Sequence, residues 1–188
     1  MPTRVLGISG SLRRDSHNTG LLRAAAETAG PDIELELYDG LKQIPPYDED
    51  DDGDPRPEAV ARLNSAIEEA DAVLFSTPEY NSSIPGQLKN AIDWVSRPLA
   101  TNALRNKPVA VVGASTGGFG AVWAQAELRK VLAVLGARVL DIEIPVPHAH
   151  TRFDEGDLTD DEIGAALAEV LDALADEVRE REEAKAVA

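Results

Sequence analysis

Uninterrupted apolar runs alternate with helical patterns along this chain, and that alternation is what most limits the folds open to it. The runs at 73–75 and 109–112 are apolar throughout, as in parallel strands covered on both faces by helices. The repeated order of strand and helix predicts a doubly wound parallel α/β sheet. The five strands that we expect are Arg4–Ser9, Ile33–Tyr38, Ala72–Thr77, Pro108–Gly113 and Arg138–Ile144.

Two of these segments alternate apolar with acidic residues, which is typical of edge strands with one wet face. They are the second strand, around Leu35, and the fifth, around Ile142. With these two strands at the edges, the flavodoxin-like order 2-1-3-4-5 fits better than the Rossmann order. We therefore expect one flavodoxin-like domain over residues 1–188, with helices on both faces of a five-stranded sheet and with its last few residues frayed.

The composition excludes several classes of function. The chain of 188 residues has no cysteine, so thiol catalysis and thiolate metal sites are ruled out, and redox chemistry would need a cofactor. A net charge of −16 opposes binding to nucleic acid. No apolar run approaches the length of a membrane span, and no signal-type segment precedes the first strand. We expect a cytoplasmic protein with no nucleic-acid or membrane partner.

The loop after the first strand is rich in groups that bind anions. In open α/β sheets the ligand lies outside the carboxyl ends of the strands. There the chain places Ser11, Arg13, Ser16 and Asn18 just ahead of a helix, whose N-terminus also favours an anion. Neither a P-loop nor a Rossmann glycine motif is present. The loop predicts a phosphate site, and the alternative is an ordinary turn in which Ser16 or Asn18 caps the helix.

Two more loops of unusual composition follow the third and fourth strands. The first offers an aromatic ring, an amide and a stiff backbone; the second offers hydroxyls and glycines that allow close approach of a ligand. A phosphate at one end and a flat polar ring at the other would suit all three loops, and flavin mononucleotide (FMN) has that shape. The candidate residues are Pro78, Glu79, Tyr80, Asn81, Ser115, Thr116, Gly117 and Gly118.

Three motifs carry a resemblance to a known family. They are Gly-Ser-Leu-Arg-x-x-Ser-x-Asn from residue 10, Pro-Glu-Tyr-Asn from residue 78 with the later Leu-Lys-Asn-Ala-Ile-Asp-Trp, and the block 128–132. The chain resembles the NADPH-dependent FMN reductases over essentially its whole length. The resemblance implies bound FMN, NADPH or NADH as donor, and ping-pong transfer of hydride to quinone, flavin, azo or metal-oxyanion acceptors. It also implies a homodimer or homotetramer.

The same resemblance implies a role for each loop. The first would bind the phosphate, residues 78–81 would lie along the isoalloxazine, and residues 115–118 would approach its pyrimidine end. No catalytic side chain is implied, because the flavin performs the chemistry; Tyr80 is a stacking candidate, and Arg14 is a candidate for a 2′-phosphate. The chain departs from the family at Ala121 and Trp123, where relatives often carry glycine and arginine.

Three other interpretations remain open from the residues. A flavin-binding electron carrier or sensor would share the same loops. A serine hydrolase is suggested by Gly-x-Ser-x-Gly around Ser115, followed by Asp141 and by His148 or His150. The two histidines also suggest a metal, but no partner of suitable spacing accompanies them, so we expect no metal site.

Overall fold

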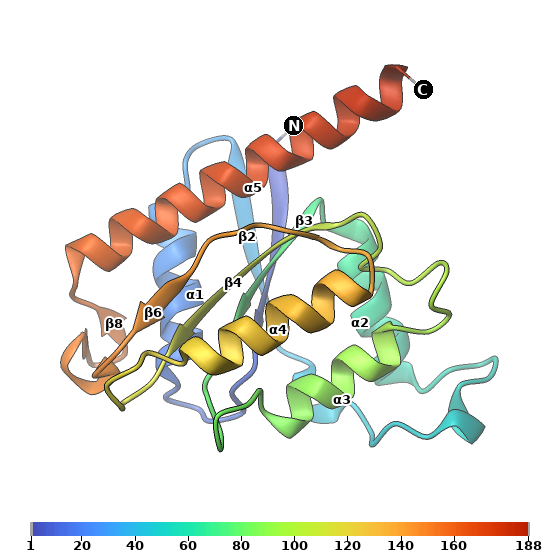
Figure 1. The fold of residues 1–188 in the computed structure, drawn as a ribbon, viewed down its shortest axis with the longest axis horizontal. Helices are drawn as coiled ribbons and strands as arrows, with labels where there is room; N and C mark the ends of the chain where they lie inside the picture. Colours follow the sequence, from blue (N-terminus) through green and yellow to red (C-terminus); the bar gives the residue numbers. More distant parts are fainter. Residues whose placement is uncertain (1, 188) are drawn as a thin grey trace.

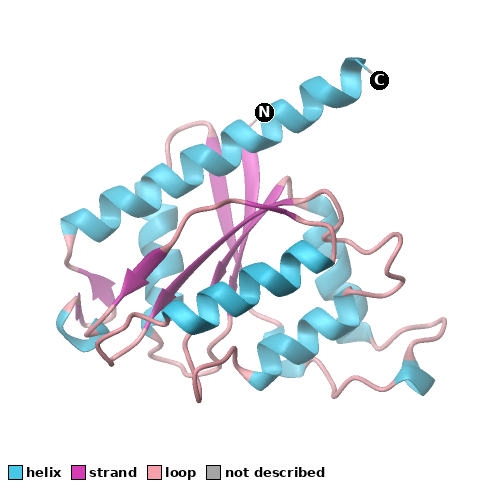
Figure 2. Cartoon of the chain, viewed as in Figure 1, coloured by secondary structure: helices cyan, strands magenta, loops and turns pink. Residues whose placement is uncertain are grey.

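A parallel sheet lies at the centre of the computed structural model, which describes residues 2–187 (Figure 2). The strands are β1 (Thr3–Ser9), β2 (Ile33–Tyr38), β3 (Ala72–Ser76), β4 (Pro108–Ala114), β5 (Arg138–Val139) and β6 (Ile144–Val146), with a separate hairpin of β7 (Phe153–Asp154) and β8 (Asp157–Leu158). The helices are α1 (His17–Thr28), α2 (Glu58–Glu69), α3 (Gly86–Val95), α4 (Val122–Val134) and α5 (Asp161–Val187). Short 3-10 turns occupy Leu41–Gln43, Glu49–Asp51 and Ala149–Thr151.

The strand order is β2-β1-β3-β4-β5, and the pairings in this sheet are parallel. The prediction of a flavodoxin-like order is therefore confirmed. The burial pattern agrees with it: β3 and β4 are buried at every residue, whereas β2 alternates between half-buried and exposed positions. β3 and β4 are buried because helices cover both faces of the sheet there, whereas β2 is partly exposed because it lies at the edge.

The fifth strand differs from the prediction of one segment from Arg138 to Ile144. It is divided into β5 and β6, which pair with the two ends of β4. Val139 lies opposite Val109, but Ile144 lies opposite Val112, so the outer segment carries two more residues than its partner. The two extra residues have no partners on β4, so the outer segment leaves the sheet between β5 and β6, as in a β-bulge.

Helices cover the two faces of the sheet in two layers (Figure 1). Successive residues of β3 point to opposite faces, as strand geometry requires: Val73 and Phe75 pack with α2, α3 and α4, whereas Leu74 packs with α1 and α5. The long α5 ends at Val187 and projects past the sheet; Ala188 lies outside the described residues. Among residues 2–187, no helix has the length and apolarity that a bilayer crossing requires.

The parallel strands end along one side of the molecule, which Figure 2 shows as the lower edge. The loops after β1, β3 and β4 therefore emerge beside one another. The close approach of β3 and β4 at this edge depends on Gly113, since a Cβ there would lie 2.7 Å from the carbonyl oxygen of Thr77. This edge is where the sequence analysis places the ligand.

Candidate functional site

Ser16 is the N-cap of α1, and its side chain bonds to the helix rather than to the loop that precedes it. Its Oγ accepts hydrogen bonds from the backbone N–H groups of Asn18, at 3.2 Å, and Thr19, at 3.4 Å. Ser16 is thus the N-cap of α1, the role given to Ser16 or Asn18 in the alternative interpretation of this loop. Capping uses only the acceptor side of the hydroxyl, so its proton stays available to an anion.

The rest of this loop carries unused donors. Ser11 is half-buried, and Arg13 is exposed. Within residues 2–187, the backbone N–H groups of Leu12, Arg14 and Asp15 donate to no protein acceptor. Hydroxyl, guanidinium and amide donors around a helix N-terminus form a chemically suitable seat for a phosphate dianion.

Asn18 has protein partners that its position in the sequence does not predict. Its side chain is buried, and its Nδ2 donates to the carbonyl oxygen of Ala114 at 3.0 Å. Its Oδ1 accepts from the N–H of Ala114 at 2.9 Å and from the hydroxyl of Ser76 at 3.0 Å. These contacts tie the start of α1 to the ends of β3 and β4, so Asn18 serves as a framework residue beneath the predicted phosphate seat.

The loop after β3 is a tight hairpin that exposes Tyr80. Tyr80 and Ser83 exchange backbone hydrogen bonds of 3.0 and 3.1 Å, and Asn81 and Ser82 have φ angles of 54° and 59°. Positive φ at both central residues defines a type I′ turn, which favours asparagine at its first position. The turn leaves 52% of Tyr80 exposed at the carboxyl edge of the sheet.

Glu79 connects this hairpin to α4. Its carboxylate accepts from the N–H groups of Trp123, at 3.0 Å, and Ala124, at 3.2 Å. These are orphan donors of a helix start, and Ala121 at the N-cap has no side-chain acceptor to satisfy them. The Glu79 side chain is therefore a helix cap from a distant loop; Pro78, beside it, is buried.

The loop after β4 is hydrogen-bonded to neighbouring backbone at its first residue and is exposed to solvent at its tip. Ser115 donates its N–H to Val146 at 3.0 Å and accepts through its carbonyl oxygen from Ala149 at 3.0 Å. Thr116, Gly117 and Gly118 are exposed. Among the described residues, the N–H groups of Thr116 and Gly118 have no hydrogen-bond acceptor. These two N–H groups are therefore available to the polar edge of a ligand ring.

The end of this loop returns tightly to α4 through two left-handed residues. Gly120 has a φ of 60°, and a Cβ on it would lie 2.6 Å from the backbone nitrogen of Val146. Ala121 has a φ of 62°, a left-handed conformation that is uncommon for a residue with a side chain. Only Gly120 is restricted by close approach as well as by its backbone angle.

The geometry around Ser115 does not support a hydrolase. A nucleophile elbow requires a sharp, strained turn leading directly into a helix. Ser115 is not among the described residues with a positive φ, and α4 begins only at Val122. The Ser115 Oγ accepts from the N–H of Gly117 at 3.1 Å, and nothing in residues 2–187 places the imidazole of His148 or His150 within hydrogen-bonding distance of it.

The two exposed histidines after β6 do not form a metal centre with other groups. Their ring centroids lie 6.4 Å apart. Over the described part of the chain, no group of three histidine or acidic side chains is arranged to hold a metal ion.

His17 is the site residue whose protonation the environment alters. Burial lowers the pKa of His17 below its usual 6.5, and the nearby positive charges of Arg13 and His150 lower it further. The ring also packs against Phe153, with centroids 5.0 Å apart. His17 is thus neutral over a wider pH range than an isolated histidine, a property that its sequence position alone does not reveal.

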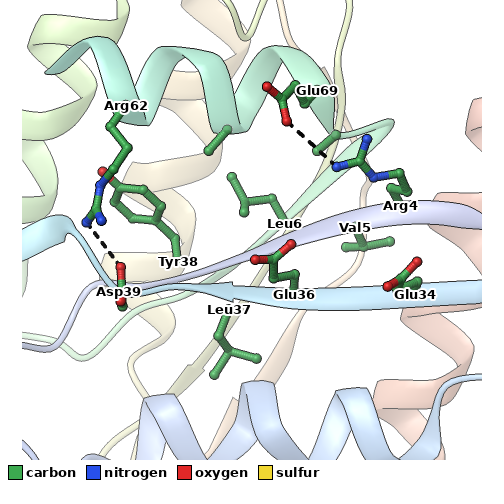
Figure 3. Close-up of a pocket in the computed structure, with 12 residues that line it drawn as sticks. Arg4, Val5, Leu6, Glu34, Glu36, Leu37, Tyr38, Asp39, Arg62 and Glu69 are labelled. Atoms are coloured by element: carbon green, nitrogen blue, oxygen red, sulfur yellow. Dashed lines mark hydrogen bonds and ion pairs between the residues drawn. The ribbon is translucent and has the colours of Figure 1, made fainter. Parts of the chain in front are cut away.

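A separate groove lies away from these loops, between β2 and α2 (Figure 3). Its volume is about 440 Å³, and each of its two arginines forms an ion pair: Arg62 with Asp39 at 3.1 Å, and Arg4 with Glu69 at 3.9 Å. Burial raises the pKa of Tyr38 there, against the opposing effect of Arg62. None of its lining residues belongs to the three loops at the carboxyl edge.

The class of protein follows from the fold: a flavodoxin-like α/β protein, in which the loops after β1, β3 and β4 meet at the carboxyl edge of the sheet. A model of the NADPH-dependent FMN reductases matches residues 3–151. The chain belongs to this family and is an FMN-dependent NAD(P)H oxidoreductase.

Comparisons with individual proteins agree over nearly the full length. The chain is 44% identical over 173 residues to an NAD(P)H-dependent FMN reductase of Pseudomonas aeruginosa, covering 91% of this chain and 92% of that one. It is 37% identical over 183 residues to a 2-hydroxy-1,4-benzoquinone reductase of a Burkholderia species, covering 96% and 99%. The solved structure of the flavoenzyme NAD(P)H:(acceptor) oxidoreductase FerB from Paracoccus denitrificans superimposes with a TM-score of 0.84 at 38% identity, covering 95% and 98%.

The residues present fit the cofactor that the family implies. The unused backbone donors at Leu12, Arg14 and Asp15 are suited to a phosphate, and those at Thr116 and Gly118 to the polar edge of a ring. The two sets lie on loops that Asn18 connects through Ala114. The donor chemistry therefore matches a ligand with an anionic end and a flat polar end.

Proposed function

We propose that this chain holds FMN across the three loops and uses it to reduce quinone-type acceptors with NADPH or NADH. Relatives named as quinone reductases support the acceptor class, among them a protein of Pseudomonas putida that is 36% identical over 173 residues. The observation that carries the proposal is the joint opening of three donor-bearing loops at one edge of the sheet.

In this proposal the first loop is the anchor. Arg13 supplies charge, Ser11 and Ser16 supply hydroxyl protons, and the backbone of residues 12–15 supplies N–H donors. A phosphate dianion satisfies many such donors at once, and charged hydrogen bonds are the strong ones. Asn18 holds the seat in place from below through one proton of its Nδ2 and through its Oδ1, and its second Nδ2 proton serves the phosphate.

The other two loops position the ring. The backbone of residues 78–81 lies along it, with Tyr80 as a stacking contact, and the N–H groups of Thr116 and Gly118 point to its pyrimidine end. When bound, FMN supplies the two-electron chemistry, receiving hydride from NAD(P)H and passing electrons to the acceptor in ping-pong order. Backbone donors at the pyrimidine end favour the negative charge that reduction places there.

No side chain is required as acid or base, so the contribution of the chain is position and exclusion of water. We also propose a homodimer or homotetramer as the working form, acting in the cytoplasm, and Arg14 as a contact for a 2′-phosphate of NADPH. The exposed position of Arg14 beside the phosphate seat supports the last assignment.

The proposal is tested by the visible spectrum of the purified protein under nitrogen. We expect flavin bands that NADPH bleaches and that a quinone then restores, with free FMN at equal concentration as the control. Bands that NADPH fails to bleach would indicate a carrier or sensor instead. A colourless protein that takes up no FMN would contradict the proposal.

A further inference from the structure

Exposed apolar side chains gather around the predicted ring site. Among the described residues, the large hydrophobic side chains with high exposure are Leu12, Tyr80, Leu99, Phe119, Trp123 and Val134. Leu12, Tyr80 and Phe119 lie on the three ligand loops, and Trp123 lies in the first turn of α4, directly after the third loop. Exposed aromatic side chains concentrated at one edge point to a contact surface.

Phe119 and Trp123 form a single aromatic unit, which we call the aromatic shelf. Their ring centroids are 4.9 Å apart with an interplanar angle of 55°. Phe119 is 65% exposed and Trp123 is 47% exposed. A tilted ring pair at this separation is mutually attractive, so the two rings support each other although solvent reaches both.

The backbone fixes the shelf beside the ring site. The N–H of Trp123 donates to Glu79, the residue before Tyr80, and Phe119 follows Gly118 at the open tip of the third loop. The shelf therefore lies between the two loops that we assign to the flavin ring. In Figure 1 this is the amino end of α4, where the loop after β4 joins it.

The charges near the shelf disfavour anions. Position 123 carries an uncharged indole, and Glu79 and Glu127 lie on the adjoining segments. The chain as a whole has a net charge of −16. A neutral, flat molecule can stack on two rings in this setting, whereas an anionic acceptor meets a repulsive field with no cation on the shelf.

The exposed area of the shelf is sufficient for a small molecule. Two partly exposed aromatic side chains offer on the order of 200–250 Å² between them. A stable protein interface needs roughly 800 Å² from each partner. The shelf is thus large enough for one aromatic ring system and is only a fraction of a dimer interface.

We propose that Phe119 and Trp123 select neutral, flat aromatic acceptors over anionic ones at this flavin site. This inference rests on the proposed function, because an acceptor can be selected only where the flavin is reduced. Trp123 acts as a specificity residue that contacts the acceptor, and it takes no part in electron transfer.

The steady-state test compares a neutral acceptor with an anionic one in the same variants. We expect Trp123→Ala to raise KM for 1,4-benzoquinone by about two- to tenfold, the range of an aromatic pair contact, and Trp123→Phe to restore most of the loss. Trp123→Arg should lower KM for ferricyanide. Leu99→Ala, which removes an equally exposed side chain from the loop after α3, is the matched control and should change neither KM.

A fluorescence titration tests the contact without turnover. Trp94 is fully buried, so Trp123 is the indole open to a quencher, and the absence of cysteine prevents addition of benzoquinone to a thiol. Oxidised wild-type protein should lose emission saturably as benzoquinone is added, and Trp123→Phe should lose this component. Linear, non-saturating quenching, or an unchanged ratio of quinone to ferricyanide kcat/KM in Trp123→Ala, would overturn the inference.

Two further outcomes separate the possible causes of failure. If wild-type flavin bands are not bleached by NADPH, the proposed function fails and the specificity assignment fails with it; normal bleaching with unchanged acceptor preference overturns the assignment alone. Conversion of an oligomer to a monomer by Trp123→Ala in analytical ultracentrifugation would show that a second copy covers the shelf, and this too would overturn it.

Discussion

The side-chain amide of Asn18 forms two hydrogen bonds with the backbone of a single residue, Ala114, which lies 96 positions later in the chain. The amide donates to the carbonyl oxygen at 3.0 Å and accepts from the N–H at 2.9 Å. Asn18 thus satisfies both backbone groups at the end of β4 and holds two ligand loops in a fixed relation.

Removing this amide is expected to destabilise the fold. Asn18→Ala leaves the N–H and C=O of Ala114 and the hydroxyl of Ser76 without their partner, at a cost of about 2–4 kcal/mol in the free energy of unfolding. Asn18→Asp is also expected to destabilise, because it turns an oxygen toward the Ala114 carbonyl. Urea denaturation measures both.

Asn64→Ala, a change at a half-exposed site within α2, is the control for the loss of an asparagine, and we expect it to stay within about 0.5 kcal/mol of wild type. A similarly small effect of Asn18→Ala would contradict the framework role.

Loss of the cation in the first loop should weaken cofactor retention. Arg13→Ala removes a charged hydrogen-bond donor, so we expect FMN affinity to fall by about tenfold to a hundredfold. Equilibrium dialysis measures this change. Arg23→Ala removes an equally exposed arginine from α1 and should leave affinity unchanged. Equal affinities of the two variants would refute the role of Arg13 as an anchor.

Glu79 is expected to act on stability through α4. Glu79→Ala removes the acceptor for the N–H groups of Trp123 and Ala124, at a cost of about 1 kcal/mol, or about 2–4 °C in Tm. Glu79→Gln keeps an acceptor oxygen and should recover most of that loss. Calorimetry measures the Tm of Glu79→Ala and Glu79→Gln, and Glu58→Ala, in the first turn of α2, is the control for the loss of a glutamate near a helix start. Equal losses in both Glu79 variants would show that charge, not capping, is what matters.

The order of the strands could be predicted from the sequence. The interruption of the outer strand and the long-range contacts of Asn18 and Glu79 could not. Uninterrupted apolar runs identify β3 and β4 as central, and alternation identifies β2 as an edge. The two extra residues between Val139 and Ile144 carry the same alternation as their neighbours, so the interruption is invisible until β4 is paired with them. Side-chain contacts across 96 and 44 positions depend on topology that local patterns do not encode.

His17 should give the stability a dependence on pH. Its pKa is lowered in the folded state by burial and by Arg13 and His150, so the unfolded chain binds more protons between that lowered value and about 6.5. Stability due to this group is therefore complete above about pH 6.5 and falls as the pH drops below it. The slope stays below the one-proton limit of about 1.4 kcal/mol per pH unit, because the ring is only partly buried.

Urea denaturation measures the free energy of unfolding of wild type and of His17→Gln between about pH 5 and about pH 7.5, a range that brackets the usual histidine pKa. We expect a flatter profile than in wild type. The control is His148→Asn, since asparagine tolerates the left-handed backbone found there, with φ at 51°. A His17→Gln profile parallel to that of wild type would rule out the effect.

We propose that the loop from Ser11 to Asn18 anchors the ligand by its phosphate while the other two loops hold the ring. The most direct measurement compares the affinities of FMN and riboflavin for the apoprotein in matched titrations, because the two ligands share the ring and differ in the phosphate. We expect FMN to bind more tightly than riboflavin by at least about a hundredfold, because its phosphate forms several charged hydrogen bonds. Equal affinities for the two ligands would contradict this proposal.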